Sequence, residues 1–143
     1  MTIRFLLDTN VLSEPPRPSP HPGVLRRLRE HRREIATAAP VWNELLYGWE
    51  RLPPSRKRET IGSYLFRTVR GSIPILPYDQ AAAEWHAAER ARLTSSGRPP
   101  AFVDGQIAAI ARVNELILVT SNRSHFEGFG DLQVVDWRDE AAP

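Results

Sequence analysis

The chain contains no cysteine, and only one of its 143 residues is methionine. The absence of cysteine excludes a disulfide framework, a thiol nucleophile and a cysteine-ligated zinc site. No apolar run approaches the roughly 18 residues that a membrane-spanning helix needs, and the N-terminus lacks the basic and then apolar pattern of a signal peptide. We therefore expect a cytoplasmic protein without a membrane partner and without covalent cross-links.

The residues that are present suit one α/β domain. A length of 143 residues is close to the commonest domain size, and 41% hydrophobic residues suffice for a core. Five short apolar segments are typical of strands: residues 3–8, 35–38, 73–76, 117–120 and 132–136. Helical patterns lie between them, over residues 23–34, 40–52, 55–70, 79–93 and 103–113. The alternation predicts a single domain, residues 1–143, with an αβα sandwich of three layers and a mainly parallel central sheet. Pro74 indicates that its strand lies at an edge.

A carboxylate ends the first predicted strand. Asp8 directly follows Phe5-Leu6-Leu7. Parallel α/β sheets place their ligand sites at the carboxyl ends of strands, so Asp8 is a candidate for chemistry. The alternative is that Asp8 only caps the turn that follows it.

Three further polar residues occupy comparable places. Glu44 lies one turn into the helix that begins at Pro40, and Asp104 is the acid of a helix that is otherwise nearly all apolar. Asn122 follows the strand predicted at 117–120. Each also has an ordinary structural explanation, as a carboxylate that favours the helix dipole, a helix cap or a turn residue.

These side chains are expected to meet, because strand ends and the starts of the following helices share one side of such a sheet. Carboxylates gathered at one point repel each other unless a cation lies between them, and hard oxygen ligands suit Mg²⁺ or Mn²⁺. The sequence therefore predicts a metal site held by Asp8, Glu44 and Asp104. Thr9 and Thr120 flank the same edge and are expected to orient ligands or waters from behind. Attack of a metal-activated water on a phosphodiester is the chemistry that such a site supports.

Four segments, taken in order, resemble a PIN-domain ribonuclease, and more narrowly a VapC-type toxin of a type II toxin–antitoxin system. FLLDTNVLSE is similar to the opening strand of the family, with Asp8 as the first acid. PVWNELLYG carries Glu44 as the second acid, and PAFVDGQIAAIA carries Asp104 as the third. LILVTSNRSHFEGFGDLQVVDW, with Asn122, is similar to the closing segment. The resemblance runs from the first strand to Trp137.

The resemblance implies a Rossmann-like αβα fold and endonucleolytic cleavage of RNA that depends on Mg²⁺ or Mn²⁺. It implies catalytic roles for Asp8, Glu44, Asp104 and Asn122, and inhibition of translation through cleavage of tRNA or rRNA. The implied partners are the RNA substrate and a cognate VapB-like antitoxin that wraps the toxin. A homodimer, a hetero-oligomer with the antitoxin, and contact with promoter DNA only through the antitoxin are implied as well.

One departure from the family pattern keeps an alternative open. Many PIN nucleases have Asp where this chain has Asn122, which supplies an oxygen but no charge. A catalytically weakened PIN module that binds RNA is therefore the alternative function. A phosphotransferase of the haloacid dehalogenase type also begins with a strand and an Asp, but it needs a second Asp two residues later, where this chain has Asn10.

Contacts to RNA are less determined by the sequence. Arginines within residues 26–33 and 56–70 are candidates for phosphate contacts, or are solvated surface. Aromatic candidates for stacking, or for the core, are Trp42, Tyr47, Trp49 and Trp85. The four histidines show no ligand spacing, so no catalytic role is assigned to them.

Overall fold

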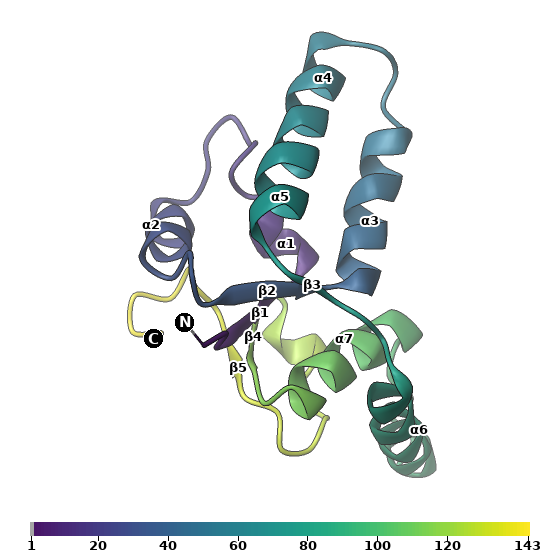
Figure 1. The fold of residues 1–143 in the computed structure, drawn as a ribbon. Coiled ribbons are helices and arrows are strands. Elements are labelled where there is room, and N and C mark those ends of the chain that lie inside the picture. The colour runs from purple at the N-terminus through teal and green to yellow at the C-terminus, as the bar shows by residue number, and fades with distance from the viewer. Residues whose placement is uncertain (1) are drawn as a thin grey trace.

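Five parallel strands form the central sheet in a computed structural model that describes residues 2–143 (Figure 1). The strands are β1 (Phe5–Leu7), β2 (Ile35–Ala38), β3 (Ile75–Leu76), β4 (Ile117–Val119) and β5 (Val134–Val135). Their order across the sheet is β3-β2-β1-β4-β5, and every neighbouring pair is parallel. The predicted parallel αβα architecture is confirmed, and β3, which follows Pro74, is an edge strand as predicted.

The central strand is apolar because both of its faces are covered. All three residues of β1 have no exposed surface, as expected for a strand of a parallel sheet between two helical layers. β1 is shorter than the predicted span 3–8, because Asp8 caps a helix that begins at Thr9. The turn expected after β1 is therefore a helical one.

Helices occupy both sides of the sheet (Figure 1). On one side α3 and the α4–α5 segment rise as two adjacent rods, and on the other side lie α6 and α7. The helical elements are α1 (Thr9–Leu12), α2 (Pro22–Glu30), α3 (Ala39–Glu50), α4 (Arg56–Ser63), the π-helix η1 (Tyr64–Val69), α5 (Arg70–Ser72), α6 (Gln80–Ser95), α7 (Phe102–Val113) and the 3₁₀ turn η2 (Arg123–His125).

Two helical predictions differ from the structure in detail. The helix expected over 55–70 is present, but its C-terminal part widens into the π-helix η1, which periodicity alone does not reveal. Residues 31–34, expected in a helix, leave it after Glu30. The ring of His31 instead stacks on Trp137 with a centroid distance of 5.6 Å, and its Nδ1 lies 2.9 Å from Oε1 of Glu34.

α6 and α7 approach closely where Gly105 faces His86. His86 is 1% exposed, and its Nδ1 is hydrogen-bonded to Tyr78 Oη at 2.7 Å. Its Nε2 is buried without a hydrogen-bond partner among the described residues. Burial lowers the pKa of His86, with a smaller contribution from the charge of Arg90, so the ring is held neutral. This contact fixes the N-terminal half of α7, which carries Asp104.

The buried guanidinium of Arg27 holds the C-terminal segment against α2. Arg27 donates to the backbone carbonyl oxygens of Trp137, Glu140 and Ala142, the last two at 3.0 and 2.9 Å. Buried cations require such partners, because an unsatisfied guanidinium would lose its hydration without compensation. In residues 2–143 no helix is both long and apolar enough to cross a membrane.

Candidate active site

The strand order has its topological switch point between β1 and β4. The chain passes from β1 to β2 and β3 on one side, and β4 and β5 lie on the other side of β1. Ligands of open α/β sheets bind at such a switch point, beyond the carboxyl ends of the strands. Asp8 follows β1 and Thr120 follows β4, and the backbone N–H of Asp8 joins them by donating to Val119 O at 2.9 Å.

Asp8 has the capping role that the sequence allowed, and its second carboxylate oxygen is held by another element. Its side chain is the N-cap of α1, with Oδ1 accepting from the Thr9 N–H at 2.7 Å. Its other oxygen, Oδ2, accepts from the Thr120 hydroxyl at 2.8 Å. Asp8 is 7% exposed. The carboxylate is therefore fixed by hydrogen bonds from two different parts of the chain, and Thr120 is one of the two donors.

Asn10 is a site residue that the sequence reasoning missed. Its Nδ2 lies 3.4 Å from Asp8 Oδ2 and donates to Thr120 Oγ1 at 3.2 Å, and its Oδ1 accepts from the Ser121 N–H at 2.9 Å. Asn10 thus ties the start of α1 to the segment after β4. The sequence signal that could have identified Asn10 is its position two residues after Asp8 in the segment FLLDTNVLSE.

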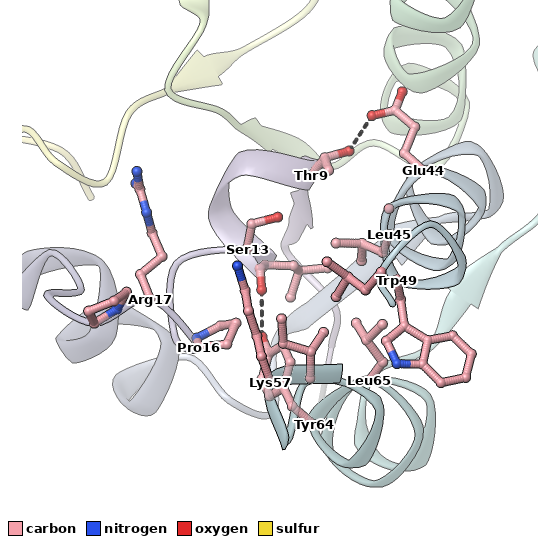
Figure 2. A pocket seen from close by; sticks show the side chains of 15 residues that line it. Thr9, Ser13, Pro16, Arg17, Glu44, Leu45, Trp49, Lys57, Tyr64 and Leu65 are labelled. Atoms are coloured by element: carbon pink, nitrogen blue, oxygen red, sulfur yellow. Dashed lines mark hydrogen bonds between the residues drawn. The ribbon is translucent and has the colours of Figure 1, made fainter. Parts of the chain in front are cut away.

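Glu44 reaches the site from α3. Its side chain is exposed, and Oε2 accepts from the Thr9 hydroxyl at 2.8 Å (Figure 2). Thr9 therefore donates hydrogen bonds to both acids, to Asp8 from its backbone N–H and to Glu44 from its hydroxyl. The predicted proximity of Thr9 to the acids is present, and its partner is Glu44.

Asp104 lies in the first turn of α7 and is partly buried. Burial raises the pKa of its carboxyl above the ordinary value, the nearby His125 opposes this rise, and the negative charges of Asp8 and Glu44 raise the pKa further. Three acids from α1, α3 and α7 thus share one electrostatic environment.

His125 was also missed, because a histidine three residues after Asn122 has no ligand spacing of its own. Its Nδ1 lies 3.7 Å from Oδ2 of Asp104. Asn122 itself is exposed at the predicted edge, and the bond that joins it to the network is made by its backbone N–H, which donates to Thr120 Oγ1 at 3.0 Å.

The donor set fits a hard divalent cation in kind. Within residues 2–143 no group of three or more acidic or histidine side chains lies close enough together to hold a metal ion. Mg²⁺ needs only one or two direct carboxylates and otherwise keeps its waters. Burial and, to a smaller extent, the negative charges of Asp8 and Glu44 raise the pKa of Asp104, and a bound cation would compensate this negative charge.

Comparisons with known proteins identify the family of the chain. Residues 5–130 match the PIN domain family. The tRNA(fMet)-specific endonuclease VapC of Shigella flexneri is 34% identical over 136 residues, which cover 94% of this chain and 98% of the relative. Toxin FitB of Neisseria gonorrhoeae is 32% identical over 125 residues, covering 85% and 90% of the two chains. The crystal structure of DNA-bound VapBC from Salmonella typhimurium superposes with a TM-score of 0.83 at 27% identity, over 94% of this chain and 98% of that one. The chain therefore belongs to the PIN domain family, among its VapC-type members.

Proposed function

We propose that this protein is a metal-dependent endoribonuclease that acts as the toxin of a toxin–antitoxin pair. The observation that supports the proposal is that, in a chain of the PIN domain family, Asp8 and Glu44 are linked through Thr9 and lie near enough to Asp104 for their charges to add to the effect of burial, which raises the pKa of the Asp104 carboxyl. A carboxyl with a raised pKa beside two other acids is a candidate ligand of Mg²⁺ or Mn²⁺, and metal-assisted cleavage of RNA is the chemistry that we propose for it.

The proposed roles follow from how each side chain is held. Asp8 and Asp104 would be the main carboxylate ligands of Mg²⁺ or Mn²⁺. Glu44, fixed by Thr9, would hold a water or position the attacking one, and Asn122 would supply a neutral oxygen. When bound, the metal provides an activated water and charge neutralisation at the phosphate. Thr120 and Asn10 would keep Asp8 oriented by their bonds to it.

The proposed substrate is tRNA or rRNA, whose cleavage would inhibit translation in the cytoplasm. A relative that is similar over nearly the whole chain is named as a tRNA(fMet)-specific endonuclease. A second relative is named a toxin. These names support the class of reaction and the role of the protein.

The proposed partner is a VapB-like antitoxin, with which the chain would form a hetero-oligomer around a toxin homodimer. A structurally similar chain was solved within VapBC bound to DNA. We propose that the present chain would likewise meet promoter DNA only through its antitoxin.

The test is cleavage of purified tRNA and rRNA by the pure protein with Mg²⁺, with Mn²⁺ and with EDTA. Asp8→Asn should abolish cleavage, and the matched control Asp131→Asn, at an exposed position with a φ of 54° that asparagine tolerates, should not. Equal cleavage by the Asp8→Asn variant and the unaltered protein would sink the proposal. RNA binding without cleavage would favour the weakened, RNA-binding module instead.

A further inference from the structure

Exposed arginines lie along α2, the helix that stands apart from the α3 and α4–α5 rods, near both chain termini (Figure 1). Arg26 and Arg29 are neighbours on the surface of α2, because residues three apart lie on one side of a helix. Arg32 and Arg33 follow directly after its C-terminal end. All four side chains are exposed. We call these four residues the α2 arginine row.

Most of the charge of the α2 arginine row is uncompensated. Arg26 lies 3.7 Å from Glu30. Among residues 2–143, the other three arginines of the row have no ion pair, side-chain hydrogen bond or aromatic partner. The other acid of this stretch, Glu34, is bonded to Arg4 and to His31. Four arginines against the single acid Glu30 therefore leave three positive charges on this face.

Ordinary structural roles account for little of this charge. A structural arginine such as Arg58 lies over the ring of Trp49 and donates to three backbone carbonyls. A cation in the last turn of a helix is favoured by the helix dipole, which accounts for Arg29. It does not account for Arg32 and Arg33, which lie beyond the helix. A row of cations without structural partners is typical of a surface that binds a polyanion.

The α2 arginine row is continuous with the surroundings of the acid site. α2 precedes the parallel strand β2, so it runs from the carboxyl edge of the sheet, where the acids lie, back to the amino edge. Its first residue, Pro22, lines a hollow of about 520 Å³ together with Asn10 and Ser121. Asn10 Oδ1 accepts from the Ser121 N–H at 2.9 Å, next to Asp8. A strand that leaves the acids over this hollow therefore meets α2, which is about 13 Å long.

The composition of the face favours a nucleic acid over a protein segment. Protein interfaces have an apolar core, often with aromatic residues. The large exposed hydrophobic residues of the described chain are Tyr47, Phe102 and Val103, which lie on α3 and α7 and not on α2. The face of α2 thus offers cations without an apolar centre, which suits the evenly spaced phosphates of a nucleic-acid backbone.

We propose that the α2 arginine row binds backbone phosphates of a large, folded RNA substrate at a distance from the cut. This inference rests on the proposed ribonuclease function and deepens it, because it names the surface that makes the enzyme prefer tRNA to a short strand. Contacts to phosphates fix the position of the RNA and carry no base preference of their own. The row therefore selects for the size of the substrate, while the sequence at the cut is read elsewhere.

The test removes the three uncompensated charges in one protein, Arg29→Gln combined with Arg32→Gln and Arg33→Gln. The substrates are tRNA and a short RNA with few nucleotides on either side of the mapped cut. At about 0.15 M salt, the ratio of the KM for tRNA to the KM for the short RNA should rise about 10- to 100-fold. The plot of log KM for tRNA against log salt should become less steep by about 2–3, the value for three phosphate contacts. The melting temperature should not change, because these side chains are exposed.

The matched control removes the same charge from exposed arginines outside α2, by combining Arg51→Gln, Arg56→Gln and Arg67→Gln. Its ratio of KM values and its salt slope should stay near those of the unaltered protein. Equal losses in the two triple variants would show that net charge alone attracts the RNA, and would overturn the inference. An equal rise of the KM for tRNA and for the short RNA in the α2 variant would overturn it as well.

Binding of tRNA in EDTA, followed by fluorescence anisotropy, separates the two levels of the argument. The α2 variant should raise the dissociation constant about as much as it raises the KM for tRNA. If the unaltered protein binds tRNA through the row but cleaves no RNA with Mg²⁺ or Mn²⁺, the ribonuclease function fails and the contact between the row and RNA stands. If the α2 variant keeps its tRNA affinity and only weakens promoter DNA binding by the complex with antitoxin, the row contacts DNA and the inference is wrong.

Discussion

Adding one methyl group at Gly105 is expected to destabilise the protein through its contact with His86. A Cβ at position 105 would lie 2.1 Å from His86 Nε2 and 2.6 Å from its Cδ2. Overpacking of a close-packed interior costs about 1–3 kcal/mol, and so close an overlap belongs near the upper value. Replacing a helical glycine by alanine returns about 1 kcal/mol. Gly105→Ala should therefore lower the free energy of unfolding by about 2 kcal/mol.

The coupling between positions 105 and 86 is measured by thermal unfolding of four proteins. These are the unaltered chain, Gly105→Ala, His86→Ala and the double variant. At about 2–4 °C per kcal/mol, the single Gly105→Ala change should lower the melting temperature by about 4–8 °C. Without the ring the new methyl group has room, so the same change should become stabilising by about 1 kcal/mol. Gly48→Ala, whose Cβ meets no atom within 4 Å, should stabilise both backgrounds equally. A Gly105→Ala effect that is the same with and without His86 would refute the reasoning.

Three further predictions concern the site and the C-terminal segment. Thr9→Val keeps the shape of the side chain but removes the donor to Glu44, so cleavage should fall about 10- to 100-fold while circular dichroism stays unchanged. Because the pKa of Asp104 is raised, the folded state binds a proton there more tightly than the unfolded state. As the pH drops through that raised pKa, the melting temperature in EDTA should rise and the cleavage rate in Mg²⁺ should fall. Melting curves of Asp104→Asn with the same pH dependence would contradict this. Arg27→Met removes charged hydrogen bonds to three carbonyls, each worth about 1.5–3 kcal/mol. The free energy of unfolding, measured in urea, should therefore drop by about 3 kcal/mol or more. A loss below about 1 kcal/mol would show that the C-terminal segment is held by other contacts.

The sequence was most informative where local pattern and topology act together. An apolar strand that ends in Asp8 predicts both the buried β1 and the edge of the sheet where its carboxylate lies. The acid of α3 could be placed near it, because a helix that follows a parallel strand begins on the same side of the sheet. This rule does not cover Asp104, because α7 follows α6 and not a strand. At Asp8 the capping role does not exclude the proposed site role, since one oxygen caps α1 and the other accepts from Thr120.

The contacts that sequence could not predict join side chains from distant elements. Asn10 is a site residue because its amide meets the chain after β4, and His125 is one because η2 places its ring near Asp104. The packing of His86 on Gly105 likewise depends on how α6 and α7 cross. Such contacts are set by tertiary packing, for which the residue pattern within one segment carries no signal.

The position of the site has a consequence for when activity can first arise during synthesis. Asp8 and its partner Thr120 are 112 positions apart, and β1 must pair with β4 before the two side chains meet. Parallel pairing across so long a stretch of chain forms late and slowly, because loop closure precedes any gain from the contact. A growing chain that ends before β4 holds Asp8 and Glu44 but lacks Thr120, whose hydroxyl orients the Asp8 carboxylate. A ribosome that makes this protein is therefore not exposed to a formed cleavage site until nearly the whole chain has been synthesised.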